Sequence, residues 1–330
     1  MTTFKEIRGT AIEVVSTDPT NPETGQIWYN SSSGTLKGYQ LIATNAWASG
    51  GSMANARYGA AGFGTQTAAL VAGGINGPTY KPQTELYNGT AWTANPTGMN
   101  TNRYALAGAG NQTAGVAFGG DASPWSQTEL WNGSVWTNNP TGLVFPGESI
   151  TGTGTQTAAL AFAGFRPGGP LGSQSNKTES FNGSTWTSSP NMNTARYGVG
   201  GAGLQTAALA FGGSDGTALV TTTESYNGTW TTVNSMNTAR YSLGGAGTQT
   251  LALAFGGYGG VPNAPITATE TWNGTSWTTV PSMATARSSL AGAGTQAAGL
   301  AFSGYTGTTG TTATEEWTGS NLAVRTVTVS

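Results

Sequence analysis

The chain contains no cysteine and no histidine among its 330 residues. The absence of cysteine excludes disulfides and thiolate nucleophiles. The absence of both residues excludes the usual Cys/His zinc sites, Ser-His-Asp triads and any imidazole acid or base. A β-rich protein of this length without disulfides has to rely on side-chain packing and on closure of its sheets. We therefore expect no metal site and no cofactor.

Charge is also scarce, with 12 Lys and Arg against 14 Asp and Glu, 8% of the chain, and a net charge of −2. Because no basic patch is present, we expect no nucleic-acid partner. No stretch is long and apolar enough to span a bilayer, so we expect no membrane insertion. Glycine is abundant at 52 residues, but 11 Trp, 11 Tyr and 10 Phe at regular spacing argue against disorder,.

One sequence motif occurs six times, at intervals of 44 to 49 residues. It begins with an Arg-Tyr pair in most copies and continues with Gly-x-Gly-x-Gln and a short run of small apolar residues. A variable stretch, Thr-Glu-x-aromatic-Asn-Gly and a Trp follow. This period predicts a radial or stacked repeat and not six separate domains. The six glutamines are Gln66, Gln112, Gln156, Gln205, Gln249 and Gln296.

Each unit shows the pattern of four short antiparallel strands. In the fourth unit, residues 206–211 (TAALAF) form an apolar strand, and Asn227-Gly228 favours a two-residue hairpin turn before Trp230,. Small residues dominate the first two strands and aromatic residues the outer two, as in a wedge that narrows toward an axis. The units therefore predict the blades of a β-propeller. The alternative is a linear β-solenoid, which the four-strand unit and the repeat length disfavour.

Between residues 51 and 330 the repeats resemble the kelch family, on a Gly-Gly doublet, an aromatic residue after Thr-Glu and a following Trp. The doublets are Gly73-Gly74, Gly119-Gly120, Gly212-Gly213 and Gly256-Gly257, with Ala163-Gly164 and Ser303-Gly304 departing from them. The resemblance implies a β-propeller with a binding or scaffolding role, and it implies no single ligand. Six first-and-second-strand hairpins predict an all-β, six-bladed, kelch-like propeller.

Closure of the ring is expected to use the N-terminal side of the repeats. Outer-strand tryptophans occur in five units, whereas the sixth has Leu322 in that place. Trp47 lies ten residues before Arg57, as Trp186 lies ten before Arg196. We therefore expect residues 36–50 to supply the closing strand of the last blade, which gains an extra strand if residues 321–329 pair there too. The predicted division is an arm and hairpin over residues 1–35 and a propeller over 36–330.

A repeated arginine and a repeated glutamate hold a large share of the charges. Because the repeat distributes them around a ring, we interpret them as structural ion pairs or hydrogen bonds. In the third unit Gly147 replaces the arginine, so Glu179 is expected to use Lys177, Arg166 or backbone donors. The repeat Gln-Thr pair is likewise interpreted as structural. The arginines are Arg57, Arg103, Arg196, Arg240 and Arg287; the glutamates are Glu85, Glu129, Glu179, Glu224, Glu270 and Glu315.

The variable stretches between second and third strands lie on one face of such a propeller, over residues 75–83, 121–127, 165–177, 214–222, 258–268 and 305–313. Variable loops on a rigid scaffold are where recognition usually occurs, and exposed aromatic residues suit sugars or protein partners. The alternative is that they only cover blade edges. The candidate binding residues are Tyr80, Trp125, Phe165, Tyr258, Tyr305, Asp121 and Asp215.

An enzyme is not expected. Asp121 and Asp215 are the only acidic residues in those stretches, and they lie two blades apart, whereas a glycosidase needs two carboxylates close together. A carboxylate pair within reach in one pocket would reopen this question.

The first fifty residues break the period. The text NPETGQIWYNSSSGTLKGY, at residues 21–39, resembles a leader of virion structural proteins of tailed bacteriophages, and it includes a hairpin with Ser-Gly at its tip,. The resemblance implies a protein located in the virion, in a tail, fibre or head appendage, with the arm bound to other virion proteins. The propeller would bind a host-surface glycan or protein, or lock neighbouring subunits; a homo-oligomer within the particle is left open. The alternative is a secreted or surface bacterial propeller lectin.

Overall fold

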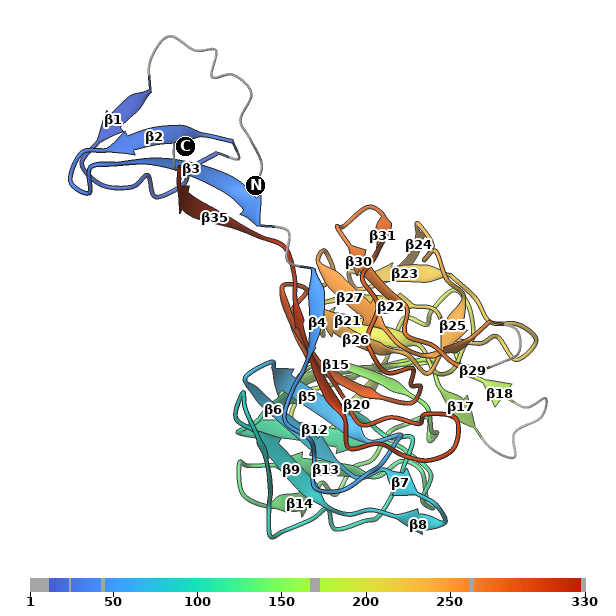
Figure 1. The fold of residues 1–330 in the computed structure, drawn as a ribbon. Helices are drawn as coiled ribbons and strands as arrows, with labels where there is room; N and C mark the ends of the chain where they lie inside the picture. Colours follow the sequence, from blue (N-terminus) through green and yellow to red (C-terminus); the bar gives the residue numbers. More distant parts are fainter. Residues whose placement is uncertain (1–11, 24, 43–44, 167–172, 261–263, 328–330) are drawn as a thin grey trace. The chain divides into compact units, whose positions relative to one another are not determined.

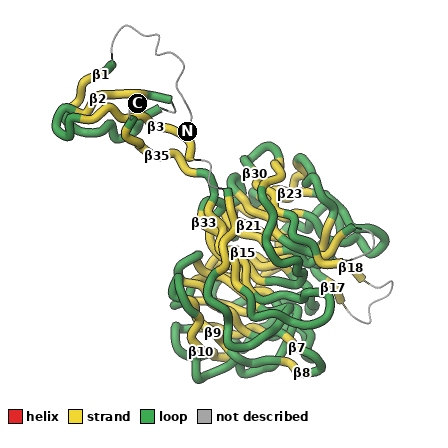
Figure 2. The backbone as a smooth tube through the Cα atoms, in the orientation of Figure 1, coloured by secondary structure: helices red, strands yellow, loops and turns green. Residues whose placement is uncertain are grey.

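The computed structural model describes residues 12–23, 25–42, 45–166, 173–260 and 264–327. Parts of the predicted arm (1–11), of two variable loops (167–172 and 261–263) and of the expected last strand (328–329) lie outside the described residues. Throughout the described part the chain consists of strands and loops, without a helix (Figure 2). It accordingly contains no helix long and apolar enough to cross a membrane.

Contacts divide the chain into two compact units: residues 1–45 with 319–330, and residues 46–318. The first unit holds one four-stranded sheet in the order β1 (Glu13–Val15), β2 (Ile27–Asn30), β3 (Thr35–Ile42) and β35 (Asn321–Thr326) (Figure 1). β1 and β2 are parallel, whereas β2 and β3 form an antiparallel hairpin. Gly34 at the end of its turn has a φ of 65°, which glycine adopts without steric cost,.

Asp18 ties this first sheet together. Its carboxylate accepts hydrogen bonds from Trp28 Nε1 at 3.1 Å, Asn30 Nδ2 at 2.7 Å and Lys37 Nζ at 2.7 Å. These bonds, that from Lys37 first, lower the pKa of Asp18 from 3.8 to about 2. Because the folded-state pKa is depressed, ionised Asp18 stabilises the unit fully above pH 3.8, and this contribution is lost as the pH falls toward 2,.

We expect the Asp18→Asn variant to lose this acid dependence. In the wild-type protein the indole N–H resonance of Trp28, followed by NMR, should change with a midpoint near the lowered pKa of about 2. The variant should show no such change, because its amide does not titrate. A wild-type midpoint at the ordinary carboxyl value would contradict the hydrogen-bonding scheme.

The second unit contains six four-stranded antiparallel sheets. The first three comprise β5 (Ala61–Thr65), β6 (Ala68–Ala72), β9 (Thr84–Tyr87) and β10 (Trp92–Ala94); β11 (Ala107–Asn111), β12 (Ala114–Phe118), β13 (Thr128–Trp131) and β14 (Trp136–Asn138); and β15 (Thr151–Thr155), β16 (Ala158–Phe162), β19 (Thr178–Phe181) and β20 (Trp186–Ser189). In each, strand order follows the chain, so consecutive strands are joined by hairpin connections.

The other three sheets repeat this order, with one exchange. They comprise β21 (Gly200–Leu204), β22 (Ala207–Phe211), β23 (Thr223–Tyr226) and β24 (Trp230–Val233); β26 (Gly244–Gly247), β27 (Ala252–Phe255), β30 (Thr269–Trp272) and β31 (Trp277–Val280); and β32 (Ala291–Gly294), β33 (Ala298–Phe302), β34 (Thr314–Thr318) and β4 (Ala46–Ser49). In the sixth sheet the outer strand is thus β4, from the opposite end of the sequence.

Short two- and three-stranded ribbons are formed by the stretches between the second and third strands of three repeats, joined in the fifth repeat by the segment that precedes its first strand. They pair β7 (Ile75–Asn76) with β8 (Thr79–Tyr80), β17 (Phe165–Arg166) with β18 (Ser173–Gln174), and β25 (Arg240–Tyr241) with β28 (Tyr258–Gly259) and β29 (Ala264–Pro265).

The first strands of the six sheets lie side by side in cyclic order, β5, β11, β15, β21, β26, β32 and back to β5. Small residues permit this approach: a Cβ on Gly245 would lie 2.4 Å from the carbonyl oxygen of Gly201 in the preceding sheet. Larger side chains fill the space farther out, where each pair of neighbouring sheets encloses its own apolar cluster. The arrangement is all-β and consistent with a β-propeller-like fold.

The closing strand is shorter than the sequence suggested. Only residues 46–49 join the last sheet, with Trp47 opposite Trp317, while residues 37–42 pair with β35 in the first unit. The expectation that residues 36–50 supply the closing strand is therefore wrong for residues 37–42, and residues 321–326 add no extra strand to the last sheet because they pair with β3. Trp47 Nε1 donates to Thr269 Oγ1 in the preceding sheet at 3.0 Å, a bond that Leu322 has no group to make.

Candidate functional site

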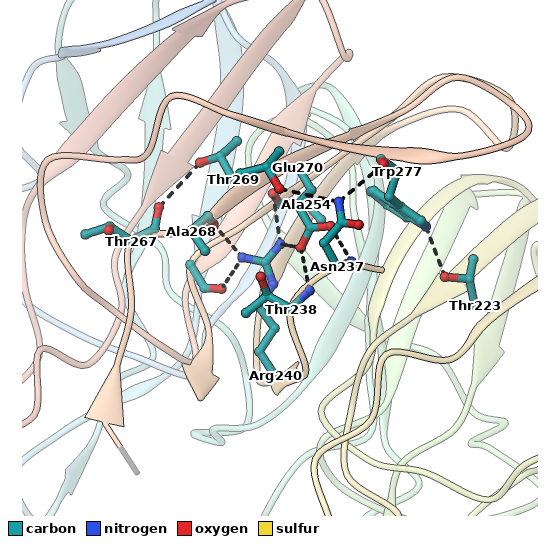
Figure 3. A network of polar contacts seen from close by, with 12 residues as sticks. Thr223, Asn237, Thr238, Arg240, Ala254, Thr267, Ala268, Thr269, Glu270 and Trp277 are labelled. Atoms are coloured by element: carbon teal, nitrogen blue, oxygen red, sulfur yellow. Dashed lines mark hydrogen bonds and ion pairs between the residues drawn. The ribbon is translucent and has the colours of Figure 1, made fainter. Parts of the chain in front are cut away.

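The repeat arginines lie in buried polar networks, of which Arg240 is typical (Figure 3). Its Nη1 donates to the carbonyl oxygens of Ala268 at 2.5 Å and Gly256 at 3.3 Å, and its Nη2 donates to Glu270 Oε1 at 3.2 Å. Glu270 also accepts a bond from the backbone N–H of Asn237 at 2.7 Å. Burial lowers the pKa of Arg240 to about 10, and the neighbouring carboxylate opposes that shift.

Four other units repeat the pair, so these charges are spread one pair to a sheet and do not gather in one pocket. Both side chains of each pair are almost completely buried. The pairs are Arg57–Glu85, Arg103–Glu129 at 3.1 Å, Arg196–Glu224 at 2.8 Å and Arg287–Glu315 at 2.8 Å. This distribution favours the structural interpretation of these residues, which variants can test.

In the third unit, which lacks the repeat arginine, Glu179 has backbone donors alone. Glu179 accepts bonds from the N–H groups of Val144 at 2.7 Å and Phe145 at 2.9 Å. Lys177 Nζ lies over the Phe145 ring, 5.0 Å from its centroid. Burial raises the pKa of Glu179, and its two backbone donors oppose that shift.

The repeat glutamines connect neighbouring sheets. Gln112 Nε2 donates to the carbonyl oxygens of Ala69 at 3.0 Å and Tyr87 at 2.7 Å, both in the preceding sheet. Gln66 makes the same pair of bonds to Gly299 at 3.0 Å and Trp317 at 2.8 Å in the sixth sheet. The first and last sheets are therefore joined by the same contacts as any other neighbours.

A hollow of about 170 Å³ lies where the repeats converge, lined by residues of all six units that follow the repeat-arginine position. Six backbone N–H groups form a hydrogen-bonded circle beside it: Gly59 donates to Ser289 at 2.8 Å, Ser289 to Ser242 at 2.8 Å, Ser242 to Gly198 at 2.6 Å, Gly198 to Ser149 at 3.3 Å, Ser149 to Ala105 at 2.8 Å and Ala105 to Gly59 at 2.7 Å. Every member of the circle has a positive φ, between 48° and 60°. Residues other than glycine rarely adopt this backbone conformation. The closed circle of hydrogen bonds holds the four non-glycine members in it,.

Half-buried aromatic rings lie near this hollow, and Tyr58 and Tyr104 line it. Phe165, Tyr197, Tyr241 and Tyr258 form a continuous series, with ring centroids 5.5 to 5.7 Å apart. Tyr305 packs against Tyr58 at 5.2 Å, and Tyr80 packs against Tyr104 at 5.3 Å. Four of the five predicted aromatic residues, all except Trp125, thus pack against a tyrosine that follows a repeat arginine.

Asp121 links two loop aromatics. It accepts bonds from the Tyr80 hydroxyl at 2.6 Å and from Trp125 Nε1 at 3.3 Å. The bond to Asp121 raises the pKa of Tyr80 to about 12, so this phenol is neutral at ordinary pH. Glu148 lies close enough to interact with Asp121: burial and then the Asp121 charge raise the pKa of Glu148. Asp215, in contrast, accepts bonds from Thr217 and Ala218 within its own turn.

The variable face offers aromatic rings, neutral phenolic hydroxyls and acidic acceptors near the central hollow, which suits stacking and hydrogen bonding to sugars or to a protein surface. Tyr58, Tyr104, Tyr197 and Tyr241 were not among the predicted binding residues, because their repetition after arginine marked them as parts of the unit. It also did not pair Glu148 with Asp121. The replacement of the repeated tyrosine by Glu148 was the available signal.

Among the described residues, no group of three or more His, Cys, Asp or Glu side chains is placed to hold a metal ion. No family model matches this sequence, and no curated protein matches it significantly.

Proposed function

We propose that this protein is a non-enzymatic structural component of a tailed-phage particle. In this proposal the six sheets are the blades of a closed, kelch-like propeller, and the N-terminal segment binds other virion proteins. The closed circle of six backbone hydrogen bonds supports closure with six blades. The leader resemblance supports the virion assignment.

The observation that carries the binding role is the contrast between the two ends of the sheets. Turns between first and second strands are short and alike, whereas the stretches between second and third strands differ and pack Phe165 and Tyr258 against the tyrosines that follow the repeat arginines, next to the residues that line the central hollow. A rigid scaffold that holds dissimilar aromatic loops around one hollow is suited to recognition of a host-surface glycan or protein, or of a neighbouring subunit. Asp121 accepts side-chain hydrogen bonds from two aromatic residues, which supports a role in positioning loops. Glu148 forms a carboxylate pair with it, but neither carboxylate lines the central hollow, which supports a non-enzymatic role.

The second candidate is a bacterial surface lectin, favoured by the same aromatic rings. A lectin with repeated sites should present one set of side chains in every unit. Here the equivalent positions after the repeat arginine hold Tyr58, Tyr104, Glu148, Tyr197, Tyr241 and Ser288. A single asymmetric site therefore fits this chain better than six identical sugar sites.

The Tyr258→Ala variant tests the aromatic face. Tyr258 contributes a ring contact with Tyr241 at 5.5 Å, and an aromatic anchor in an interface contributes more than about 1 kcal/mol when it is a hot spot. We expect particles carrying the variant to adsorb to host cells at least about fivefold more weakly. The matched control is Leu204→Ala, an exposed residue, 55% accessible, at the end of β21 beside a short turn.

Equal adsorption by the two variants and the wild-type particle would contradict recognition through this face. An equal loss in both variants would point to general destabilisation, which their melting temperatures would reveal.

A further inference from the structure

The third unit contains a buried carboxylate whose arginine is missing. Glu179 is only 3% exposed, and its two backbone donors are the same kind that Glu85, Glu129, Glu270 and Glu315 receive in their units. In five units a guanidinium completes the site, whereas the third has Gly147 at the arginine position. Among the described residues, no lysine or arginine nitrogen lies within ion-pair distance of Glu179.

The acceptors of a guanidinium remain in place. In each complete unit the arginine Nη1 donates to two backbone carbonyls. One belongs to the residue sixteen positions after the arginine and the other to the residue two positions before the glutamate. In the fourth unit these are Gly212, at 2.6 Å from Arg196, and Thr222, at 2.8 Å. The corresponding carbonyls of the third unit belong to Ala163 and Lys177. Ala163 has a φ of 61°, close to the 67° of Gly212, so the backbone follows the same course at this point.

A larger hollow adjoins the small recess that Glu179 lines. A hollow of about 190 Å³ is lined by Gly147, Ala163 and Lys177 and by Phe165 of the variable face. One water molecule needs roughly 10–15 Å³ on this measure. A smaller recess of about 10 Å³ shares Phe145, Ala163 and Lys177 with it and reaches Glu179. The neighbouring cations leave the recess open, because Lys177 Nζ lies over the Phe145 ring and Arg166 is exposed. A planar group entering from the larger hollow has to displace the Phe145 ring to reach the carboxylate.

We propose that this recess binds a guanidinium group supplied from outside the chain, with Glu179 as its anion and the Ala163 and Lys177 carbonyls as its further acceptors. The group is an arginine side chain of a partner protein or a free guanidino compound. Guanidinium is selected over ammonium because its planar fork donates to a carboxylate and to carbonyls at once, as the five intramolecular arginines do. This inference does not depend on whether the partner belongs to a virion or to a host.

Calorimetric titration of the full chain tests the site with methylguanidinium and with two blocked tripeptides, glycine-arginine-glycine and glycine-lysine-glycine. We expect the arginine peptide to bind at least about tenfold more tightly than the lysine peptide, and Glu179→Gln to weaken its binding by a similar factor. Binding of methylguanidinium alone would assign the site to free guanidino compounds, and binding of the arginine peptide would assign it to a partner's side chain. Absence of binding by both, or equal binding of both peptides, overturns the proposal.

A second variant fills the site from within. Gly147→Arg restores the repeat arginine and should abolish binding of the arginine peptide. A Cβ at this position would lie 2.9 Å from the carbonyl oxygen of Phe165, so Gly147→Ala, which carries the same crowding without the guanidinium, is the matched control and should retain binding. Loss of binding in both Gly147 variants, with Glu179→Gln unaffected, would place the ligand outside the recess and reject the assignment.

Discussion

The Arg196→Ala variant is expected to lose about 3–5 kcal/mol of unfolding free energy, because it leaves the buried Glu224 carboxylate without its counter-charge. Arg196 is fully buried and donates from Nη2 to Glu224 at 2.8 Å and from Nη1 to two backbone carbonyls. Removal therefore leaves three acceptors without this donor. Urea denaturation followed by circular dichroism measures the loss, and adsorption or partner binding by the folded fraction should be unchanged.

The chain supplies a matched control in its third unit. Glu224→Gln should destabilise the protein, since it leaves the buried Arg196 charge unpaired. Glu179→Gln should destabilise the protein less, because Glu179 has no arginine to leave unpaired and the amide removes only one of its two backbone acceptors,. Equal effects of the two glutamate variants would show that the ion pair contributes little. Loss of binding by Arg196→Ala at unchanged stability would contradict the structural role.

Strand positions could be predicted from the sequence because local and global signals agree in this chain. Asn227-Gly228 favours a tight turn, small residues lie where sheets converge, and Trp230 occurs where an outer strand begins, so propensity and packing point to the same element. The six four-stranded sheets and the use of the Trp47 segment in the last one agree with that analysis. Periodicity is most informative where each copy has the same surroundings.

Features that depend on departures from the repeat were harder to predict. β35 pairs with β3, and both segments lie outside the six repeats. The composition of neither segment indicates which strand it pairs with. The tyrosines after the repeat arginines look like parts of the unit, yet they pack beside the hollow at which the units converge. Glu148 interacts with Asp121 of the preceding unit, a contact between units that spacing along one unit does not reveal.

A protein that consists of residues 46–318 alone is expected to fold, whereas one that consists of residues 50–318 should not remain monomeric. The difference is β4, whose Trp47 ring lies 5.4 Å from Trp317 and 5.3 Å from Phe255 and whose indole N–H is bonded to Thr269. Without β4 the sixth sheet ends at β34 and presents a row of unpaired backbone groups, a template for association with another chain. Size-exclusion chromatography and thermal melting distinguish the two proteins.

Trp47→Ala in the full chain separates the packing of the indole from the pairing of the strand. Trp47 is only partly buried, so its truncation should cost less than the about 3–5 kcal/mol of a fully buried Trp. Because β4 retains its backbone bonds, this variant should stay monomeric. Aggregation of the 46–318 protein would show that the second unit depends on the first. If it folds, it should also fail to enter assembled particles, since the proposed attachment segment is missing. Incorporation of the 46–318 protein would move the attachment to the sheets themselves and make their aromatic face an assembly surface.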